Sequence, residues 1–172
     1  MGTTGEQICG EYLERCRDCQ AVIYDLRVTN TQRAIDVVGL DLQTKTIYVC
    51  EVATHLGGLQ YVTNKQPDNF NRLKAKFDAG IPHVQSSFKN MKIVPMLWSP
   101  IVKSSGIKHN AMRDMTKLET HIQTTYGLKI QLIINDQYRD AVLELKALVS
   151  KLTTDLRSPV GRMLQILSKI GV

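Results

Sequence analysis

The stretch that decides the fold is Ala34-Ile35-Asp36-Val37-Val38-Gly39-Leu40-Asp41, followed after a short polar turn by Ile47-Tyr48-Val49-Cys50-Glu51-Val52. The β-branched residues of both segments predict strands over residues 33–40 and 46–54. A further apolar run at 21–28 precedes them, separated by a polar turn. Turns this short favour an antiparallel meander of three strands.

Apolar residues at helical spacing predict helices on either side of this meander. The first helix is expected to end near residue 18. The second opens at Pro67-Asp68 and is closed by Gly80. A fourth strand is expected at 92–98, where Pro95 argues for an edge position or a bulge.

A helix over 110–126 and a strand over 128–134 complete the predicted core, with a Ser/Pro/Lys/Gly loop before them at 99–108. This order of elements predicts an α/β (α+β) domain on a mixed sheet, over residues 1–135.

Residues 136–172 are predicted to form a C-terminal helical hairpin. A stripe of apolar residues recurs at steps of four and three, which is typical of a helix and compatible with coiled-coil packing. The stripe consists of Tyr138, Val142, Leu145, Val149, Leu152 and Leu156. Packing on the parent sheet is the favoured interpretation, and a homodimer interface through residues 138–171 is the alternative.

The composition is that of an ordinary globular protein of 172 residues, with 43% hydrophobic and 22% charged residues. The chain has no apolar run near the roughly 20 residues of a membrane-spanning helix. The first residues do not resemble a secretory signal, so a cytoplasmic protein is expected. The lone motif Cys16-x-x-Cys19 lacks a second ligand pair, which favours buried free thiols over a zinc site.

Charge is unevenly distributed along the chain. The net charge is −3 over residues 1–60, +7 over residues 61–130 and +2 over the remainder. An acidic region beside a basic segment suits a metal site next to a phosphate-binding surface, and it also suits an unevenly charged solvated surface. Under the first interpretation, basic residues between 65 and 117 hold a phosphate backbone, and DNA is the expected partner.

Asp36 and Glu51 are the unusual residues of the two strands, because each carboxylate has apolar neighbours. Burying a carboxylate is costly unless something compensates its charge. Two carboxylates on adjacent hairpin strands could share a divalent cation, and their hard oxygen atoms suit Mg²⁺ or Mn²⁺. The alternative is that each side chain points to solvent from a half-exposed strand.

These two strands resemble the centre of the PD-(D/E)XK nucleases, a family that includes restriction endonucleases and archaeal-type Holliday-junction resolvases. The family carries an aspartate at the start of one strand, and an acidic residue, a spacer and a lysine on the next. A helix like the one that begins at Gly5-Glu6 often adds a glutamate, here Glu6. The resemblance implies a restriction-endonuclease-like mixed central sheet flanked by helices, and metal ligands at Asp36, Glu51 and Val52.

The sequence departs from the family at Ala53, where the family's lysine is expected two residues after Glu51. Another cation would have to reach the site. Candidates are Lys65, Lys74 and His55, with Lys74 on the helix where family members sometimes carry a displaced lysine. Gln60 and Tyr61 could also enter the site from the loop.

Two functions are consistent with this pattern, and a third possibility is an unrelated α/β domain whose carboxylates are structural. The first is a Mg²⁺- or Mn²⁺-dependent DNA endonuclease, with Asp36 and Glu51 at its centre. The second is a catalytically degenerate nuclease-fold module that binds DNA or a protein partner without cleaving.

Overall fold

The computed structural model describes residues 2–104 and 110–171. The end of the predicted loop at 99–108 lies outside the described residues. The elements follow the predicted order of helix, three strands, helix, strand, helix, strand and helices. They are α1 (Thr4–Cys16), β1 (Ala21–Arg27), β2 (Ala34–Asp41), β3 (Thr46–Val52), β4 (Val62–Thr63), β5 (Gln66–Pro67), α2 (Asn69–Ser87), β6 (Lys92–Ser99), α3 (Ala111–Tyr126), β7 (Gln131–Ile134), α4 (Asp136–Val149) and α5 (Pro159–Lys169).

The main sheet has five strands in the order β1-β2-β3-β6-β7. The first three form the predicted antiparallel meander, and β6 and β7 add to it in parallel. The predicted α+β class, a mixed sheet flanked by helices, is therefore confirmed.

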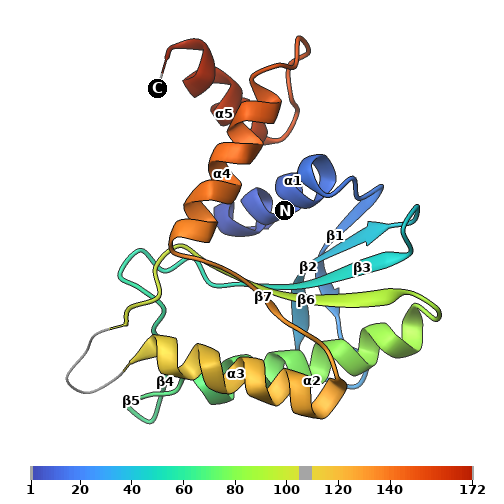
Figure 1. Cartoon of the computed structure of the whole chain (residues 1–172), viewed down its shortest axis with the longest axis vertical. Coiled ribbons are helices and arrows are strands. Elements are labelled where there is room, and N and C mark those ends of the chain that lie inside the picture. Colours follow the sequence, from blue (N-terminus) through green and yellow to red (C-terminus); the bar gives the residue numbers. More distant parts are fainter. Residues whose placement is uncertain (1, 105–109, 172) are drawn as a thin grey trace.

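Helices cover both faces of this sheet (Figure 1). Helix α1 packs on one face together with α4 and α5, and α2 and α3 lie on the other. The apolar core is divided accordingly. Trp98 and Leu13 belong to the cluster beneath α1, whereas Leu97 and Phe77 belong to the cluster beneath α2 and α3. The sheet thus separates two apolar layers.

Helix α2 is longer than predicted, because it continues through Gly80 and Pro82 to Ser87. A β-carbon at position 80 would lie 3.1 Å from Cγ1 of Ile35, so glycine permits close contact between helix and sheet rather than ending the helix. Ile81 and Val84 are completely buried beyond it. Their burial outweighs the backbone hydrogen bond that Pro82 cannot make.

Strand β6 lies in the interior of the strand order, so the predicted edge position is wrong for the strand as a whole. Its pairing with β7 begins only at Met96, whereas its pairing with β3 includes Pro95. Trp98 accepts a backbone hydrogen bond from Ala53, the residue after β3, and residues alternate in direction along a strand. The nitrogen of Pro95 therefore faces the β7 side of the strand, at a position before β7 begins. Proline at this position removes no hydrogen bond from the sheet.

The C-terminal hairpin packs on the parent domain, as favoured from its sequence. Leu145 and Leu164 join the core cluster that contains Trp98 of β6. Helix α4 ends at Val149, earlier than the apolar stripe predicts, and Leu152 and Leu156 pack against the same cluster from the connection. Among the described residues, no helix is both long and apolar enough to cross a membrane.

Three of the four cysteines are buried, namely Cys9, Cys19 and Cys50, and all four are free thiols. Cys9 and Cys50 lie in contact between α1 and β3, and burial raises the pKa of the Cys9 thiol well above its ordinary value. These thiols behave as small apolar core residues.

Candidate active site

Asp36 and Glu51 meet where strands β2 and β3 separate. The paired register of the two strands ends at Val37 opposite Cys50, so Asp36 and Glu51 form the next cross-strand pair. The Oδ2 atom of Asp36 accepts a hydrogen bond of 2.7 Å from the backbone N–H of Val52. The carboxylate thus satisfies a strand N–H that the diverging partner strand no longer reaches.

A kink in the outer strand accompanies this site. Asp25 lies opposite Asp36, but the β1–β2 register omits this pair, and Asp25 has a φ of 53°. A positive φ is uncommon for a residue other than glycine, although aspartate tolerates it better than most. Side chains of both Ile35 and Asp36 consequently contact the α2 layer, against Gly80 and Lys76 respectively. Val37 belongs to the cluster on the α1 side, so regular alternation already places Asp36 on the α2 side with Glu51, and the break in alternation brings Ile35 to that side as well.

Lys76 of α2 completes a three-residue cluster with these carboxylates. Its Nζ atom lies 3.1 and 3.0 Å from the two carboxylate oxygens of Asp36 and 2.5 Å from Oε2 of Glu51. The Glu51 side chain is 1% exposed, against 16% for Asp36 and 29% for Lys76. The ammonium group therefore lies at the opening of the site, with Glu51 at its base.

The electrostatics of the cluster are unbalanced, because two carboxyl groups share one ammonium group. Burial raises the pKa of Glu51 to about 8; the nearby Asp36 adds to the rise, and Lys76 opposes it. Burial alone would lower the pKa of Lys76, but Glu51 and Asp36 outweigh it and raise this pKa above its ordinary value. Lys76 is thus charged near neutral pH, while Glu51 largely keeps its proton.

A cavity of about 560 Å³ opens directly onto the cluster. Asp36, Lys76 and Tyr61 line it, together with Arg33 and Arg72. One N–H of Arg33 donates to the backbone carbonyl of Ala75, and the guanidinium of Arg72 lies 6.0 Å from the centre of the Tyr61 ring. The two arginines give the cavity cationic walls around an acidic base.

Most of the other predicted site residues are engaged elsewhere. Glu6 accepts a backbone hydrogen bond of 2.8 Å from Thr3 in a capping box, on the α1 side of the sheet. His55 is exposed and packs edge-on to Tyr61, with ring centres 5.6 Å apart. Gln60 is exposed, and Lys65 lies exposed in the turn between β4 and β5.

The lysine that reaches Asp36 and Glu51 is Lys76, whereas the predicted candidate was Lys74. Lys74 instead pairs with Asp78 at 2.8 Å on the flank of α2 that faces α3. Sequence signals for Lys76 are weak, because Lys74 and Lys76 lie about 80° to either side of the buried stripe centred on Leu73 and Phe77, at 100° per residue. Of the predicted residues, the structure brings Asp36, Glu51, Val52 and Tyr61 together, and it adds Lys76, Arg33 and Arg72.

The donor set fits a hard divalent cation. Two carboxyl groups supply oxygen atoms, and the Lys76 ammonium shows that the space between them attracts a cation. Mg²⁺ is commonly held by one or two carboxylates, with water and substrate phosphates completing its shell. Val52 directs its N–H to Asp36, and strand geometry places its carbonyl on the same side. Within residues 2–104 and 110–171, no group of three or more His, Cys, Asp or Glu side chains is placed to hold a metal.

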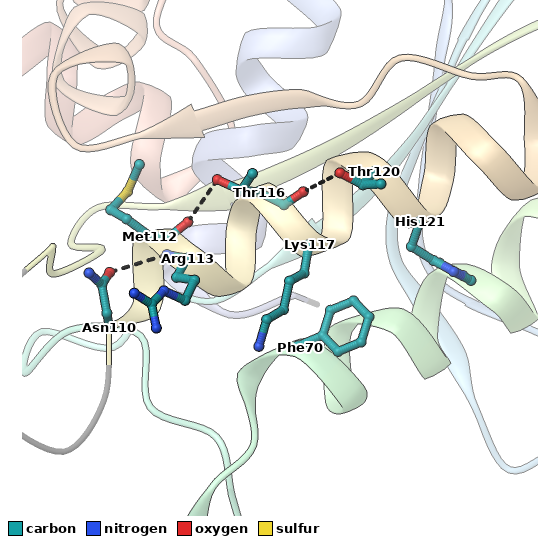
Figure 2. A pocket seen from close by; sticks show the side chains of 8 residues that line it. All are labelled: Phe70, Asn110, Met112, Arg113, Thr116, Lys117, Thr120 and His121. Atoms are coloured by element: carbon teal, nitrogen blue, oxygen red, sulfur yellow. Dashed lines mark hydrogen bonds between the residues drawn. The ribbon is translucent and has the colours of Figure 1, made fainter.

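A larger cavity, of about 670 Å³, lies on the other flank of α2 (Figure 2). Phe70 points from α2 toward α3, where Lys117 and His121 approach it; Arg113 lies further along the same helix. Among the described residues, no carboxylate lines this cavity, whereas Asp36 lines the smaller one.

Comparisons of the chain with family models, with curated proteins and with solved structures found no match.

Proposed function

We propose that the chain is a metal-dependent phosphodiesterase that acts on DNA, with Asp36, Glu51 and Lys76 at its centre. The observation that carries this proposal is the convergence of two carboxyl groups and one lysine ammonium at a cavity with arginine walls. Carboxylates, a lysine and a basic surface are the groups that phosphodiester hydrolysis requires. The mixed sheet flanked by helices agrees with the fold that the resemblance implies.

Each residue has a distinct role in this proposal. Asp36 and Glu51 would hold Mg²⁺ or Mn²⁺, which lowers the pKa of bound water and polarises a phosphate when bound. Lys76 has a flexible stem and can turn its ammonium group from the carboxylates to a phosphate oxygen. There it would stabilise the negative charge that develops on the phosphate, in place of the lysine absent at position 53. Arg33 and Arg72 would bind phosphate oxygens through their forked guanidinium groups.

The test is a cleavage assay on DNA with Mg²⁺, Mn²⁺ or EDTA. We expect cleavage with either metal ion and none with EDTA. Asp36→Asn should reduce the cleavage rate by at least about 100-fold, because it removes one of two metal ligands. Asp78→Asn, on the opposite flank of α2, is the matched control and should keep the wild-type rate within a few fold. If the wild-type protein cleaves DNA with neither Mg²⁺ nor Mn²⁺, nor with any other divalent ion, the proposal is contradicted.

A non-catalytic DNA- or protein-binding module is the second candidate function. It is favoured by the contacts of Lys76 with both carboxylates, because these contacts complete an ion-pair network that needs no metal. The residue Ala53 favours it as well. This candidate predicts salt-sensitive DNA binding without cleavage under any metal.

We also propose that the protein forms a homodimer through residues 138–171 and functions in the cytoplasm. Five large apolar side chains are exposed on the two C-terminal helices and directly after α5, which favours contact with a second copy. They are Leu143, Leu148, Met163, Ile166 and Ile170. Light scattering should show a dimer that Ile166→Glu dissociates, whereas Leu56→Glu, at another exposed leucine, leaves it intact. A wild-type protein that is monomeric at high concentration contradicts this.

A further inference from the structure

The cavity at the candidate active site continues into a second one. A cavity of about 520 Å³ lies beside the first, and both are lined by Gln32, Arg33 and Ala34. The second extends along β1 to Arg27 and Asp25. The shared lining residues place the two cavities side by side, from α2, past Asp36, to the outer strand of the sheet, and together they are called the groove.

Arginine side chains are distributed along the length of this groove. Arg72 lines its α2 end, Arg33 lines the junction of the two cavities, and Arg27 lines its far end. Arg33 is held in position by its bond to the Ala75 carbonyl, which uses one of its five N–H donors. A row of guanidinium groups that passes an acidic centre matches a polyanion whose phosphates repeat along a chain.

The size of the groove selects the form of that polyanion. The volume of the first cavity, 560 Å³, is within the usual range for small-molecule pockets. A sphere of this volume would be about 10 Å across. B-form DNA is wider than this, since its major groove alone is about 12 Å wide. A single strand can therefore enter beside Asp36 and Lys76, whereas a duplex would have to remain outside the cavity and present one of its strands to the opening.

We propose that this groove binds a single strand of DNA, with Arg33 holding the phosphate next to the one that faces Asp36. This inference rests on the proposed function, because it names the form of substrate that the same site would take. Arg27 then contacts a phosphate further along the strand. Single-stranded DNA, or a single-stranded end, is the expected substrate.

The first experiment measures binding without cleavage. Fluorescence anisotropy in EDTA would compare a labelled single strand of 20 nucleotides with the duplex of the same sequence, over a series of salt concentrations. We expect the single strand to bind at least 10-fold more tightly. Arg33→Gln and Arg27→Gln should each reduce the magnitude of the slope of log K against log salt concentration by about 0.7, where K is the association constant. This is the value for one lost phosphate contact on a single strand.

Controls separate lost contacts from lost folding. Arg157→Gln removes an exposed arginine from the connection between α4 and α5 and should leave the slope unchanged. Arg33→Lys keeps the charge and should keep the slope. Arg27 is exposed, so its variant tests the groove even if Arg33→Gln unfolds the protein. Equal or tighter binding of the duplex, or an unchanged slope in the Arg27→Gln variant, would overturn the proposal.

A cleavage arm with Mn²⁺ distinguishes this proposal from the proposed function. Cleavage of duplex DNA that Arg27→Gln does not slow would contradict the single-strand groove and leave the phosphodiesterase intact. Single-strand binding along the groove with no cleavage under any metal would contradict the phosphodiesterase and leave the groove intact.

Discussion

Helix α2 carries a lysine on each of its flanks, and the two lysines form ion pairs of different character. On the sheet side, Lys76 joins Asp36 and Glu51, whose side chains are 16% and 1% exposed. On the α3 side, Lys74 joins Asp78, whose side chain is 28% exposed. The first group holds more carboxylates than cations, whereas Asp78 is surrounded by donors.

The Asp78 group acts as a structural link between α2 and α3. Asp78 accepts hydrogen bonds from His121 at 2.6 Å, Tyr126 at 2.8 Å and Lys74 at 2.8 Å. Partial burial works against ionisation, but bonds from these three donors hold the pKa of Asp78 below its ordinary value. Three donors therefore surround a single carboxylate, so this group has no excess of carboxyl groups over donors.

The Asp36 group differs because it is incompletely neutralised. Burial raises the pKa of Glu51 to about 8, so this carboxyl group is largely protonated near neutral pH. An additional positive charge nearby would lower this pKa and favour the ionised form. The comparison teaches that ion pairing alone does not mark a functional site. The burial of Glu51 and the excess of carboxyl groups over cations distinguish the Asp36 group, and the two flanks of one helix offer an internal control for this difference.

Substitution of Lys76 is expected to have the largest effect. Lys76→Met leaves two carboxyl groups without their cation, and we expect a loss of roughly 2–4 kcal/mol in the free energy of unfolding at pH 9. We also expect DNA cleavage to fall by at least about 100-fold. Urea denaturation and the cleavage assay measure the two effects.

Lys74→Met is the matched control for this substitution. Lys74 is more exposed, and its loss should cost no more than about 1 kcal/mol without changing cleavage. Equal losses in the free energy of unfolding for Lys76→Met and Lys74→Met would contradict the difference between the two flanks of α2.

The pH dependence of stability comes next in size. A carboxyl pKa raised on folding stabilises the protein fully below the unfolded pKa, near 4.5, and this contribution disappears as pH rises through about 8. We therefore expect the contribution of Glu51 to fall by on the order of 3 kcal/mol between pH 5 and pH 9. Glu51→Gln should flatten the profile measured by urea denaturation, and Glu119→Gln, on the exposed surface of α3, should not. A profile that Glu51→Gln leaves as steep as before contradicts the buried, protonated Glu51.

The smallest effect is expected on the α3 flank. Asp78→Asn weakens three hydrogen bonds to a charged acceptor, and we expect a loss of about 1–2 kcal/mol in the free energy of unfolding. Because these bonds link α2 to α3 and touch no cavity with a carboxylate, DNA cleavage should not change. A cleavage defect in Asp78→Asn that its loss of stability does not explain would indicate a functional site on the α3 flank and contradict the proposal.

Much of the fold was predictable from local pattern. Strands β2 and β3 follow from β-branched residues between short polar turns, and α3 follows from its apolar spacing and Gly127, which ends it with a φ of 67°. Gly80 misled the prediction for α2, because its role is a close approach to Ile35 and not a turn. Pro95 misled the prediction for β6, since the length of β7 decides which backbone groups need partners.

The site was predictable only in part. Asp36 and Glu51 stood out because carboxylates are rare in apolar strands, and their meeting follows from the hairpin register. Lys76 could not be chosen over Lys74, because the two lysines flank the buried stripe of α2 symmetrically. Which flank faces the carboxylates depends on how α2 crosses the sheet, and that is set by tertiary packing.

Calorimetric titration with Mn²⁺ tests the central claim most directly, because it needs no knowledge of the substrate. We expect the wild-type protein to bind Mn²⁺, Asp36→Asn and Glu51→Gln to abolish the binding, and Asp78→Asn to leave it unchanged. Absence of binding by the folded wild-type protein at millimolar Mn²⁺, or binding that survives in Asp36→Asn, would contradict a metal site at Asp36 and Glu51.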